Sequence, residues 1–336
     1  WLGWQYTAWT TNWFDPGALA TRGVLFSIML LALVMASALP EAFGERGLVF
    51  ALCFAAIQVG RTTCMLLATG RGSPLAPNFR RIVAWNCVAA TFWIAGAFAQ
   101  GEWRLALWFV AVLAEYVSPM FGFPFPGLGR SSTSEWTIDG GHLAERCQLF
   151  VIVALGESIL ASGVAFGHHH AWHVAEFAAF LVGFVGSIAM WWMYFDTSSK
   201  EAAHVIEHAS DPGRIGARFH YTHVILVAGI IVSAVADELV IAEGGHHAQW
   251  AQVGALLGGP AIYLFGNALF KQVVYGFLPQ SHVGGLVVLA LLVPVAPHVS
   301  IFALGAATTA VMVVVAVVEA VWRRRHRNPP ARQAGH

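Results

Sequence analysis

Long apolar blocks follow one another along almost the whole chain, separated by short polar connections. A block of about 20 apolar residues has the length that crosses the hydrocarbon core of a bilayer as an α-helix. Charged residues make up only 11% of the 336 residues, whereas soluble domains carry about 25%. We therefore expect an all-α, polytopic membrane protein whose first partner is the lipid bilayer. The formal net charge of zero argues against a nucleic-acid partner.

The hydrophobic pattern predicts eleven membrane segments. They are residues 1–14, 18–39, 46–69, 79–99, 103–121, 142–165, 171–198, 216–242, 248–276, 281–297 and 299–323. The glycine- and proline-rich stretch 122–129 breaks the pattern near the middle of the chain. We expect a first helical half at residues 1–129, a second at 130–325, and a disordered cytoplasmic tail at 326–336.

Basic residues in the connections predict an orientation, because cytoplasmic loops carry an excess of Lys and Arg. With the arginines of the C-terminal tail in the cytoplasm, most other basic loop residues fall on the same side. These are Arg22, Arg71, Arg80, Arg81, Arg130, Lys200, Arg214, Arg218 and Lys271. Only Arg46 and Arg104 fall outside. We therefore expect a multi-pass protein of the bacterial cytoplasmic (inner) membrane, with Trp1 outside and His336 inside.

Two short stretches resemble each other, DPGALATR from Asp15 and DPGRIGAR from Asp211. Each offers an Asp N-cap followed by proline at the first helical position. Six predicted spans separate them, so both copies keep one orientation, which favours a parallel six-plus-six repeat. Such a repeat requires a twelfth helix before Trp1, which we expect to be missing from this chain. Chance reuse of a helix-start signal is the alternative.

Segment 142–165 carries the most charge within the predicted spans. Arg146 and Glu157 are eleven residues apart, which places them ~20° apart around the helix and ~16 Å apart along it. A polar stripe of this kind must face protein or water. Glu157 near mid-depth is a candidate proton- or cation-titrating group, with Arg146 as gate or counter-charge. Glu145 and Arg146, near the interface, are alternatively structural pairs to charges on neighbouring helices.

Arg61 and Glu115 also lie within spans, where they could pair with Glu157 or with each other. His223 lies inside the start of a span and is a proton-relay candidate, although a structural hydrogen bond between helices explains it equally well. These residues complete the predicted binding or translocation site.

Two further groups of charges have simpler explanations. Asp237 and Glu238 lie nearer the outer edge and are interpreted as interfacial residues. Glu319 precedes Arg323 by one helical turn and is interpreted as its i,i+4 partner.

The stretch from His204 to His208 reads HVIEH, which matches a zinc-binding pattern. It lies in a polar connection without an evident third ligand, so we interpret it as an amphipathic surface helix. No metal and no cofactor are predicted, and no catalytic residues are assigned. His204 and His208 are kept only as metal-site alternatives.

The stretch HLAERCQLFVIVALGESIL, residues 142–160, closely resembles the signature helix of the bacterial low temperature requirement protein A family. Further matches follow at WWMYFD, DPGRIGARFHYTHVILVAGI and GGPAIYLFGNALFK, and WQYTAWTTNWFDP fits the family's second helix. The resemblance implies a twelve-helix membrane protein whose first helix, an acidic and Phe-rich one, is absent here. The family's recurring polar positions correspond to Glu145, Arg146, Gly156, Glu157, Asp196, Asp211, Arg218, His223 and Lys271.

The family name reports a phenotype and not a chemistry, so three functions stay open. The expected one is a secondary transporter or channel-like protein, not an enzyme, with an unknown small solute or ion. The first alternative is a membrane-embedded enzyme or lipid-handling protein. The second is a non-transporting structural or stress-response protein. The sequence does not indicate an oligomeric state.

Overall fold

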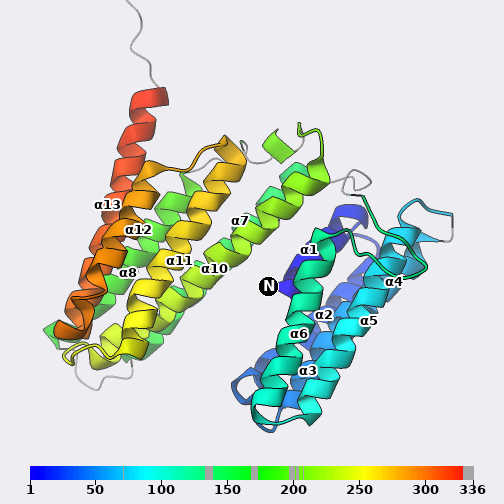
Figure 1. Ribbon diagram of the computed structural model, residues 1–336, viewed down its shortest axis with the longest axis horizontal. Coiled ribbons are helices and arrows are strands. Elements are labelled where there is room, and N and C mark those ends of the chain that lie inside the picture. The colour runs from blue at the N-terminus through cyan, green and yellow to red at the C-terminus, as the bar shows by residue number, and fades with distance from the viewer. Residues whose placement is uncertain are drawn as a thin grey trace, which may run out of the picture. The chain divides into compact units, whose positions relative to one another are not determined.

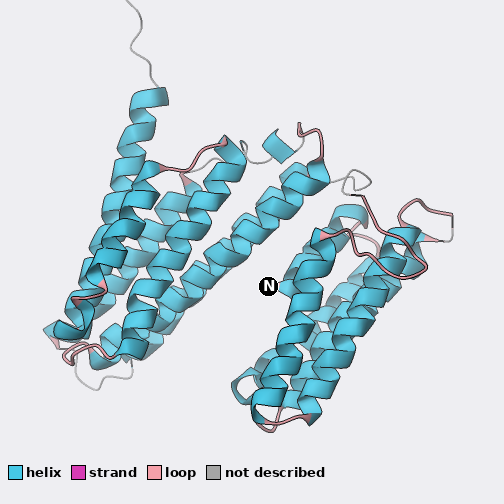
Figure 2. Ribbon diagram, in the orientation of Figure 1, coloured by secondary structure: helices cyan, strands magenta, loops and turns pink. Residues whose placement is uncertain are grey.

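The computed structural model describes residues 1–70, 72–132, 139–167, 173–196, 201, 204–206 and 208–327. The described part is helical, with no named strand (Figure 2), which confirms the predicted all-α class. The chain divides into two compact units. Unit 1 comprises Trp1–Asp139 and Ser210–Arg214, and unit 2 comprises Gly140–Ala209 and Ile215–His336. The main division thus lies a little beyond the one predicted after residue 129.

Unit 1 consists of the helices drawn from blue to blue-green in Figure 1. They are α1 (Leu2–Trp13), α2 (Leu19–Ala38), the 3₁₀ turn η1 (Leu39–Glu41), α3 (Gly47–Ala55), the π-helical turn η2 (Ala56–Gly60), α4 (Arg61–Thr69), α5 (Ala76–Phe98) and α6 (Gly101–Met120). α3, η2 and α4 follow one another without a break, so the predicted segment 46–69 is one rod. α5 packs against α3, α4 and α6, and α2 packs against α3.

Aromatic side chains form the core between α3, α5 and α6. Trp93 and Trp108 are buried, and their rings lie 5.3 Å apart between centroids. The Trp108 indole donates a hydrogen bond of 2.9 Å to the Trp93 carbonyl. A Cβ at Gly96 would lie only 2.4 Å from the Trp108 ring. This position therefore requires glycine for α5 and α6 to approach each other.

The two arginines that break the predicted charge bias bind backbone carbonyls at helix ends. Arg104 is buried, and its guanidinium donates to carbonyls of two turns, those of Ala42, Gly44, Gly96, Ala97 and Ala99. Arg46 donates to the Ser37 carbonyl near the end of α2. Carbonyls at helix C-termini lack helical partners and attract cations. The local structure thus accounts for both exceptions.

Unit 2 contains the remaining helices, drawn from green to red in Figure 1. They are α7 (Gly140–Gly167), α8 (Val174–Phe195), α10 (Pro212–Glu243), α11 (Trp250–Tyr275), α12 (Gln280–Leu292), the 3₁₀ turn η4 (Ala296–His298) and α13 (Ile301–Arg327). Residues 212–214 at the start of α10 fall in unit 1. α8 packs against α7 and α13, and α12 packs against α11 and α13. α10 and α11 approach so closely at Gly229 that a Cβ there would lie 2.4 Å from the Tyr263 nitrogen.

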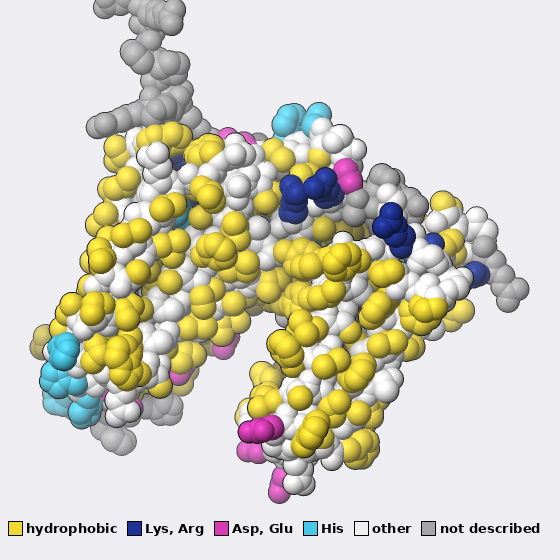
Figure 3. All heavy atoms as spheres, in the orientation of Figure 1, with side chains coloured by type: hydrophobic (Ala, Val, Ile, Leu, Met, Phe, Trp, Pro, Cys, Tyr) yellow, Lys and Arg dark blue, Asp and Glu magenta, His cyan; other side chains and the backbone are white. Residues whose placement is uncertain are grey.

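Each predicted segment contains a helix, but the number of crossings stays a prediction. By length and composition, eight of the described helices can span a bilayer. α1 has 12 residues and α12 has 13, and α6 carries Glu102, Arg104 and Glu115. α12 ends at Leu292, before the predicted residue 297, because Pro294 lacks the backbone N–H that continues a helix. In each unit, hydrophobic side chains cover the visible long sides of the helices, and Lys and Arg gather near one end (Figure 3).

The two resembling helix entrances differ in their local structure. Asp211 directly precedes α10, and its carboxylate accepts a hydrogen bond of 2.9 Å from the Arg214 N–H, as predicted for an N-cap. Asp15 does not cap α2, because that helix begins at Leu19 after Ala18. The Asp15 carboxylate instead accepts from Gly17 N–H and closes a turn. The internal repeat stays a prediction.

Candidate functional site

A buried group of charges lies where α8, α11, α12 and α13 meet at one end of unit 2. Lys271 on α11 is 1% exposed and Glu319 on α13 is 6% exposed. The Lys271 ammonium donates a hydrogen bond to Glu319 Oε1, and the Arg323 guanidinium donates to the same oxygen at 2.9 Å. One carboxylate oxygen therefore lies between two cations.

Arg323 connects this pair to the end of α8. Its Nη1 donates to the Asp196 carbonyl at 2.6 Å, and its Nε lies 3.5 Å from the Asp196 carboxylate. Its guanidinium also stacks over the Tyr275 ring, 5.3 Å from the centroid. Tyr275 in turn donates to Glu201 at 2.5 Å. Asp196 follows the last residue of α8, so a helix end supplies both a carbonyl and a carboxylate to one arginine.

His282 on α12 is the last member of this buried group. His282 is fully buried, and its Nε2 lies 2.8 Å from Asn267 Oδ1 and 3.9 Å from Glu319 Oε2. Glu319 Oε2 itself accepts no hydrogen bond from the part of the chain that the structure describes. We call the six residues Asp196, Lys271, Tyr275, His282, Glu319 and Arg323 the Lys271 cluster.

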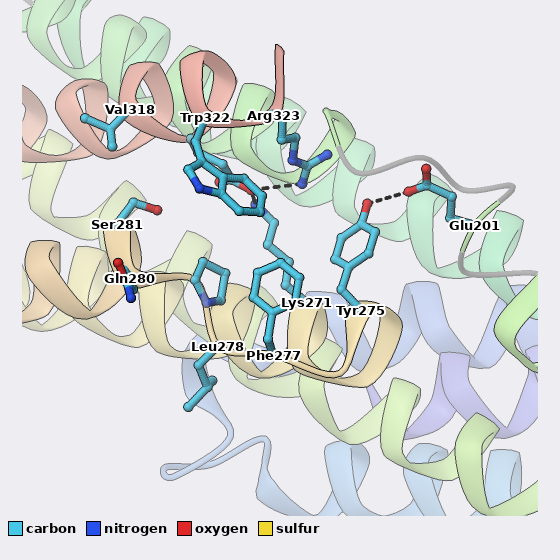
Figure 4. Close-up of a pocket in the computed structure, with 12 residues that line it drawn as sticks. Glu201, Lys271, Tyr275, Phe277, Leu278, Gln280, Ser281, Val318, Trp322 and Arg323 are labelled. Atoms are coloured by element: carbon cyan, nitrogen blue, oxygen red, sulfur yellow. Dashed lines mark hydrogen bonds and ion pairs between the residues drawn. The ribbon is translucent and has the colours of Figure 1, made fainter. Parts of the chain in front are cut away.

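An open pocket of 530 Å³ adjoins the Lys271 cluster. In Figure 4, Lys271 and Tyr275 extend from α11 toward α13, which carries Trp322 and Arg323. The pocket is lined by Glu201, Lys271, Tyr275, Phe277, Leu278, Pro279, Gln280, Ser281, Val318, Glu319, Trp322 and Arg323. Charged groups thus form one part of the wall, and aromatic and aliphatic side chains form another.

Sequence reasoning missed the Lys271 cluster as a site, although α11 carries a signal for it. Tyr263, Asn267, Lys271 and Tyr275 follow one another at intervals of four residues, which places them on one face of the helix. The first three are fully or almost fully buried. The pairing of Glu319 with Arg323 was predicted, but its pairing with Lys271, 48 residues away, was not readable.

A second buried polar group lies in unit 1 around the π-helical turn. Gln58 in this turn is 1% exposed. Its side-chain oxygen accepts from Arg61 at 2.6 Å, and its nitrogen donates to Glu115 Oε1 at 3.5 Å. Arg61 also donates to the Gly3 carbonyl. Arg61 and Glu115 therefore meet through an amide, and π-turns of this kind recur at functional sites.

His223 forms a buried hydrogen-bonded pair with Tyr194. Its Nδ1 lies 2.7 Å from the Phe219 carbonyl, and its Nε2 lies 2.8 Å from the Tyr194 hydroxyl. Because a carbonyl only accepts, Nδ1 carries the proton and Nε2 accepts from the tyrosine. The pair joins α8 to α10 in the manner of the predicted structural hydrogen bond.

The charges of α7 lie in neither buried group. Glu145 and Glu157 are exposed, and Arg146 is half-buried. The buried face of α7 presents mainly small and apolar residues, including Leu143, Cys147 and Leu155. Unit 2 by itself therefore gives Glu157 no partner among the described residues.

The remaining candidates are distributed over helix ends. Arg218 is exposed near the start of α10. The rings of His204 and His208 lie 3.9 Å apart, and Glu207 of the HVIEH pattern lies outside the described residues. The histidines at 168–170 also lie outside them. Within the described part of the chain, no group of three or more His, Cys, Asp or Glu residues could hold a metal ion.

Comparisons with known proteins cover almost the whole chain. A sequence model described as Bacterial low temperature requirement A protein (LtrA) matches residues 1–317. Uncharacterized protein RA0937 of Rhizobium meliloti (strain 1021) is 37% identical over 335 residues, which cover 98% of this chain and 81% of that protein. No solved structure matches the chain.

Proposed function

We propose that this chain, which belongs to the bacterial low temperature requirement A protein family, is a secondary transporter of a small anionic solute. It acts in the cytoplasmic (inner) membrane of a bacterium, with its C-terminus in the cytoplasm. The proposed binding site is the Lys271 cluster with the adjoining pocket. The gathering of Lys and Arg near one end of the helices in each unit supports the orientation (Figure 3).

The sharing of Glu319 Oε1 by Lys271 and Arg323 is the observation that carries this proposal. Lysine and arginine are the side chains that bind carboxylates and phosphates. In the solute-free protein, Glu319 serves as their internal counter-charge. A solute carboxylate or phosphate can replace it without leaving a buried cation unpaired, and Glu319 can later displace the solute.

The pocket also fits a small organic molecule. Its volume of 530 Å³ falls within the roughly 300–1,000 Å³ of ligand pockets. Phe277, Leu278 and Trp322 supply apolar wall for a carbon skeleton, and the Ser281 hydroxyl adds a hydrogen-bonding group. The site thus combines a cationic end for the anion with an apolar wall.

Anion binding and flux together test the proposal. The probes are inorganic phosphate, short mono- and dicarboxylates and sugar phosphates, measured by thermal unfolding in detergent and by flux into liposomes. We expect Lys271→Met to abolish both signals. Glu319→Gln should bind the probe anion more tightly, because the internal competitor is gone, yet lose flux. Arg324→Gln, at an exposed neighbouring position, is the matched control and should behave like the wild type.

Two results would count against a transporter. One is the absence of any stabilisation or flux by the whole panel of anions. The other is unchanged anion binding in Lys271→Met, which would show that the anion binds at a site other than the Lys271 cluster.

Lipid binding at the same pocket is the second candidate. Phe277, Leu278, Val318 and Trp322 are between 45% and 50% exposed, so an acyl chain could lie along them while its phosphate meets Lys271 and Arg323. Mass spectrometry of co-purified lipids distinguishes the two functions. A lipid-handling protein should retain an anionic lipid that Lys271→Met loses, and should show no flux of soluble anions.

A further inference from the structure

A second cavity lies within unit 2 between α8, α10, α11 and α13. It shares no lining residue with the pocket at the Lys271 cluster. Its volume is 30 Å³, enough for one water molecule or one small cation. Its lining combines one acid, Asp237, with the hydroxyl residues Ser233, Thr308 and Thr309.

Asp237 is the group that gives this cavity its charge. The sequence places both Asp237 and Glu238 near the outer edge of the span, but Glu238 is exposed whereas Asp237 is half-buried and packs against α8. A Cβ at Gly183 would lie 2.9 Å from the Asp237 carboxyl carbon, so glycine leaves the space that the carboxylate occupies. The structure gives Asp237 no hydrogen bond or ion pair with any described residue.

Ser233 is independent evidence for a ligand. It lies one helical turn before Asp237 on α10, which places both on one face. Ser233 is 6% exposed, and its Oγ has no hydrogen-bond partner among the described residues. Buried hydroxyl groups almost always have a partner in native proteins. A bound species in the cavity would supply the missing one.

The other lining groups also offer oxygen atoms. Pro260 has no N–H, so the Leu256 carbonyl one turn earlier lacks its usual helical donor, and both residues line the cavity. Thr308 donates its hydroxyl proton to the Gly305 carbonyl, and Thr309 donates to that of Val182. Both hydroxyl oxygens therefore keep lone pairs for a cation. The lining contains no Lys, Arg or His.

We propose that the cavity formed by Asp237, Ser233, Leu256, Thr308 and Thr309 is a sodium-binding site. Carboxylate, carbonyl and hydroxyl oxygens are the ligands that hard cations prefer, and transporters use carbonyls freed at helix breaks for coupling ions. Its coupling role rests on the proposed function. A solute anion entering an inside-negative cell moves against the membrane potential, and a co-bound sodium ion cancels that charge.

Sodium-dependent thermal stability of the purified full chain tests the site. Unfolding is followed in detergent while NaCl replaces choline chloride at constant ionic strength, with KCl as a parallel series. A ligand at about 100 times its Kd should raise the Tm on the order of 5 °C. We expect this shift for the wild type and for the exposed control Glu238→Gln. Asp237→Asn should lose it, and Ser233→Ala should need more sodium for half of the effect.

Gly183→Ala provides a second test that leaves every ligand chemically intact. Its Cβ would displace the Asp237 carboxylate, so the sodium concentration for half of the shift should rise. The absence of a shift when sodium replaces choline would overturn the site. An equal shift with potassium would also overturn it, and so would an unchanged shift in Asp237→Asn.

Anion binding at the Lys271 cluster separates this inference from the proposed function. A sodium shift that depends on Asp237, without any anion binding, keeps the cation site and refutes the anion transporter. Anion binding and flux that depend on Lys271 but neither on sodium nor on Asp237 refute the coupling site and keep the transporter.

Discussion

Glu319→Gln would leave the buried Lys271 and the half-buried Arg323 without their shared counter-charge. Lys271 and Arg323 both donate to Glu319 Oε1, and no other carboxylate of the described residues contacts Lys271. Lys271→Met is a milder change, because Glu319 would keep Arg323 at 2.9 Å. Each substitution removes one partner of the Lys271–Glu319 pair, but we expect Glu319→Gln to lower the stability of unit 2 more than Lys271→Met does.

The magnitudes follow from what each variant leaves unpaired. Removing one partner of a buried ion pair costs ~3–5 kcal/mol because the other charge stays uncompensated, and this applies to Glu319→Gln. Losing one charge-assisted hydrogen bond costs ~1.5–3 kcal/mol, which we expect for Lys271→Met. In the double variant only Arg323 remains, and it keeps Asp196 at 3.5 Å. The double variant should therefore be more stable than Glu319→Gln alone.

Thermal unfolding in detergent, with a double-mutant cycle, measures these differences. At ~2–4 °C per kcal/mol, Glu319→Gln should lower the Tm by roughly 6–20 °C. Added phosphate should restore part of that loss, because it supplies the missing counter-charge. Arg324→Gln, at an exposed position, should leave the Tm unchanged. The reasoning is refuted if Lys271→Met destabilises more than Glu319→Gln, or if the two effects simply add.

Three further substitutions and one control probe the packing of the units, each by chemical unfolding in detergent. Gly229→Ala would place a Cβ 2.4 Å from the Tyr263 nitrogen and should lower the free energy of unfolding by ~1–3 kcal/mol or more. The control Gly258→Ala, with open space around it, should be neutral or stabilising. Equal effects of the two substitutions would contradict this packing. Arg104→Gln should lower the free energy of unfolding by at least ~1.5–3 kcal/mol, since the Arg104 guanidinium binds several carbonyls. An unchanged stability would show that water hydrogen-bonds to these carbonyls instead. Gln58→Leu should lower the free energy of unfolding by ~1–3 kcal/mol, because it leaves the buried Arg61 and Glu115 without the amide that bonds to both. No loss of stability would show that Arg61 and Glu115 pair directly.

Local patterns in the sequence were sufficient for the helices. Apolar blocks of membrane-spanning length predict helices because lipid offers no partner for backbone N–H and C=O groups. The ends were predictable where one residue decides them, as at Asp211. The start of α2 was not predictable from Asp15, because a local turn competes with the helix for this residue. The Asp15 carboxylate accepts a hydrogen bond from Gly17 N–H and does not cap the helix.

Charged residues within the spans were recognisable, but their partners were not. Glu157 and Arg146 share a helix face, as the spacing requires, and yet Glu157 is exposed on unit 2. The cluster that the structure does bury joins Lys271 to Glu319 on a different helix. The four-residue spacing of Asn267, Lys271 and Tyr275 on α11 was the available signal, and it indicates a polar face without identifying what it meets.

The sequence by itself determined that this chain is a helical membrane protein, because composition and periodicity act on each segment separately. Only the tertiary structure decided which charges meet, because ion pairs form over a few ångströms between helices that lie far apart along the chain. It also separated neighbours that the sequence could not distinguish. Asp237 faces a cavity between four helices while Glu238 is exposed, since one residue along a helix turns the side chain by ~100°.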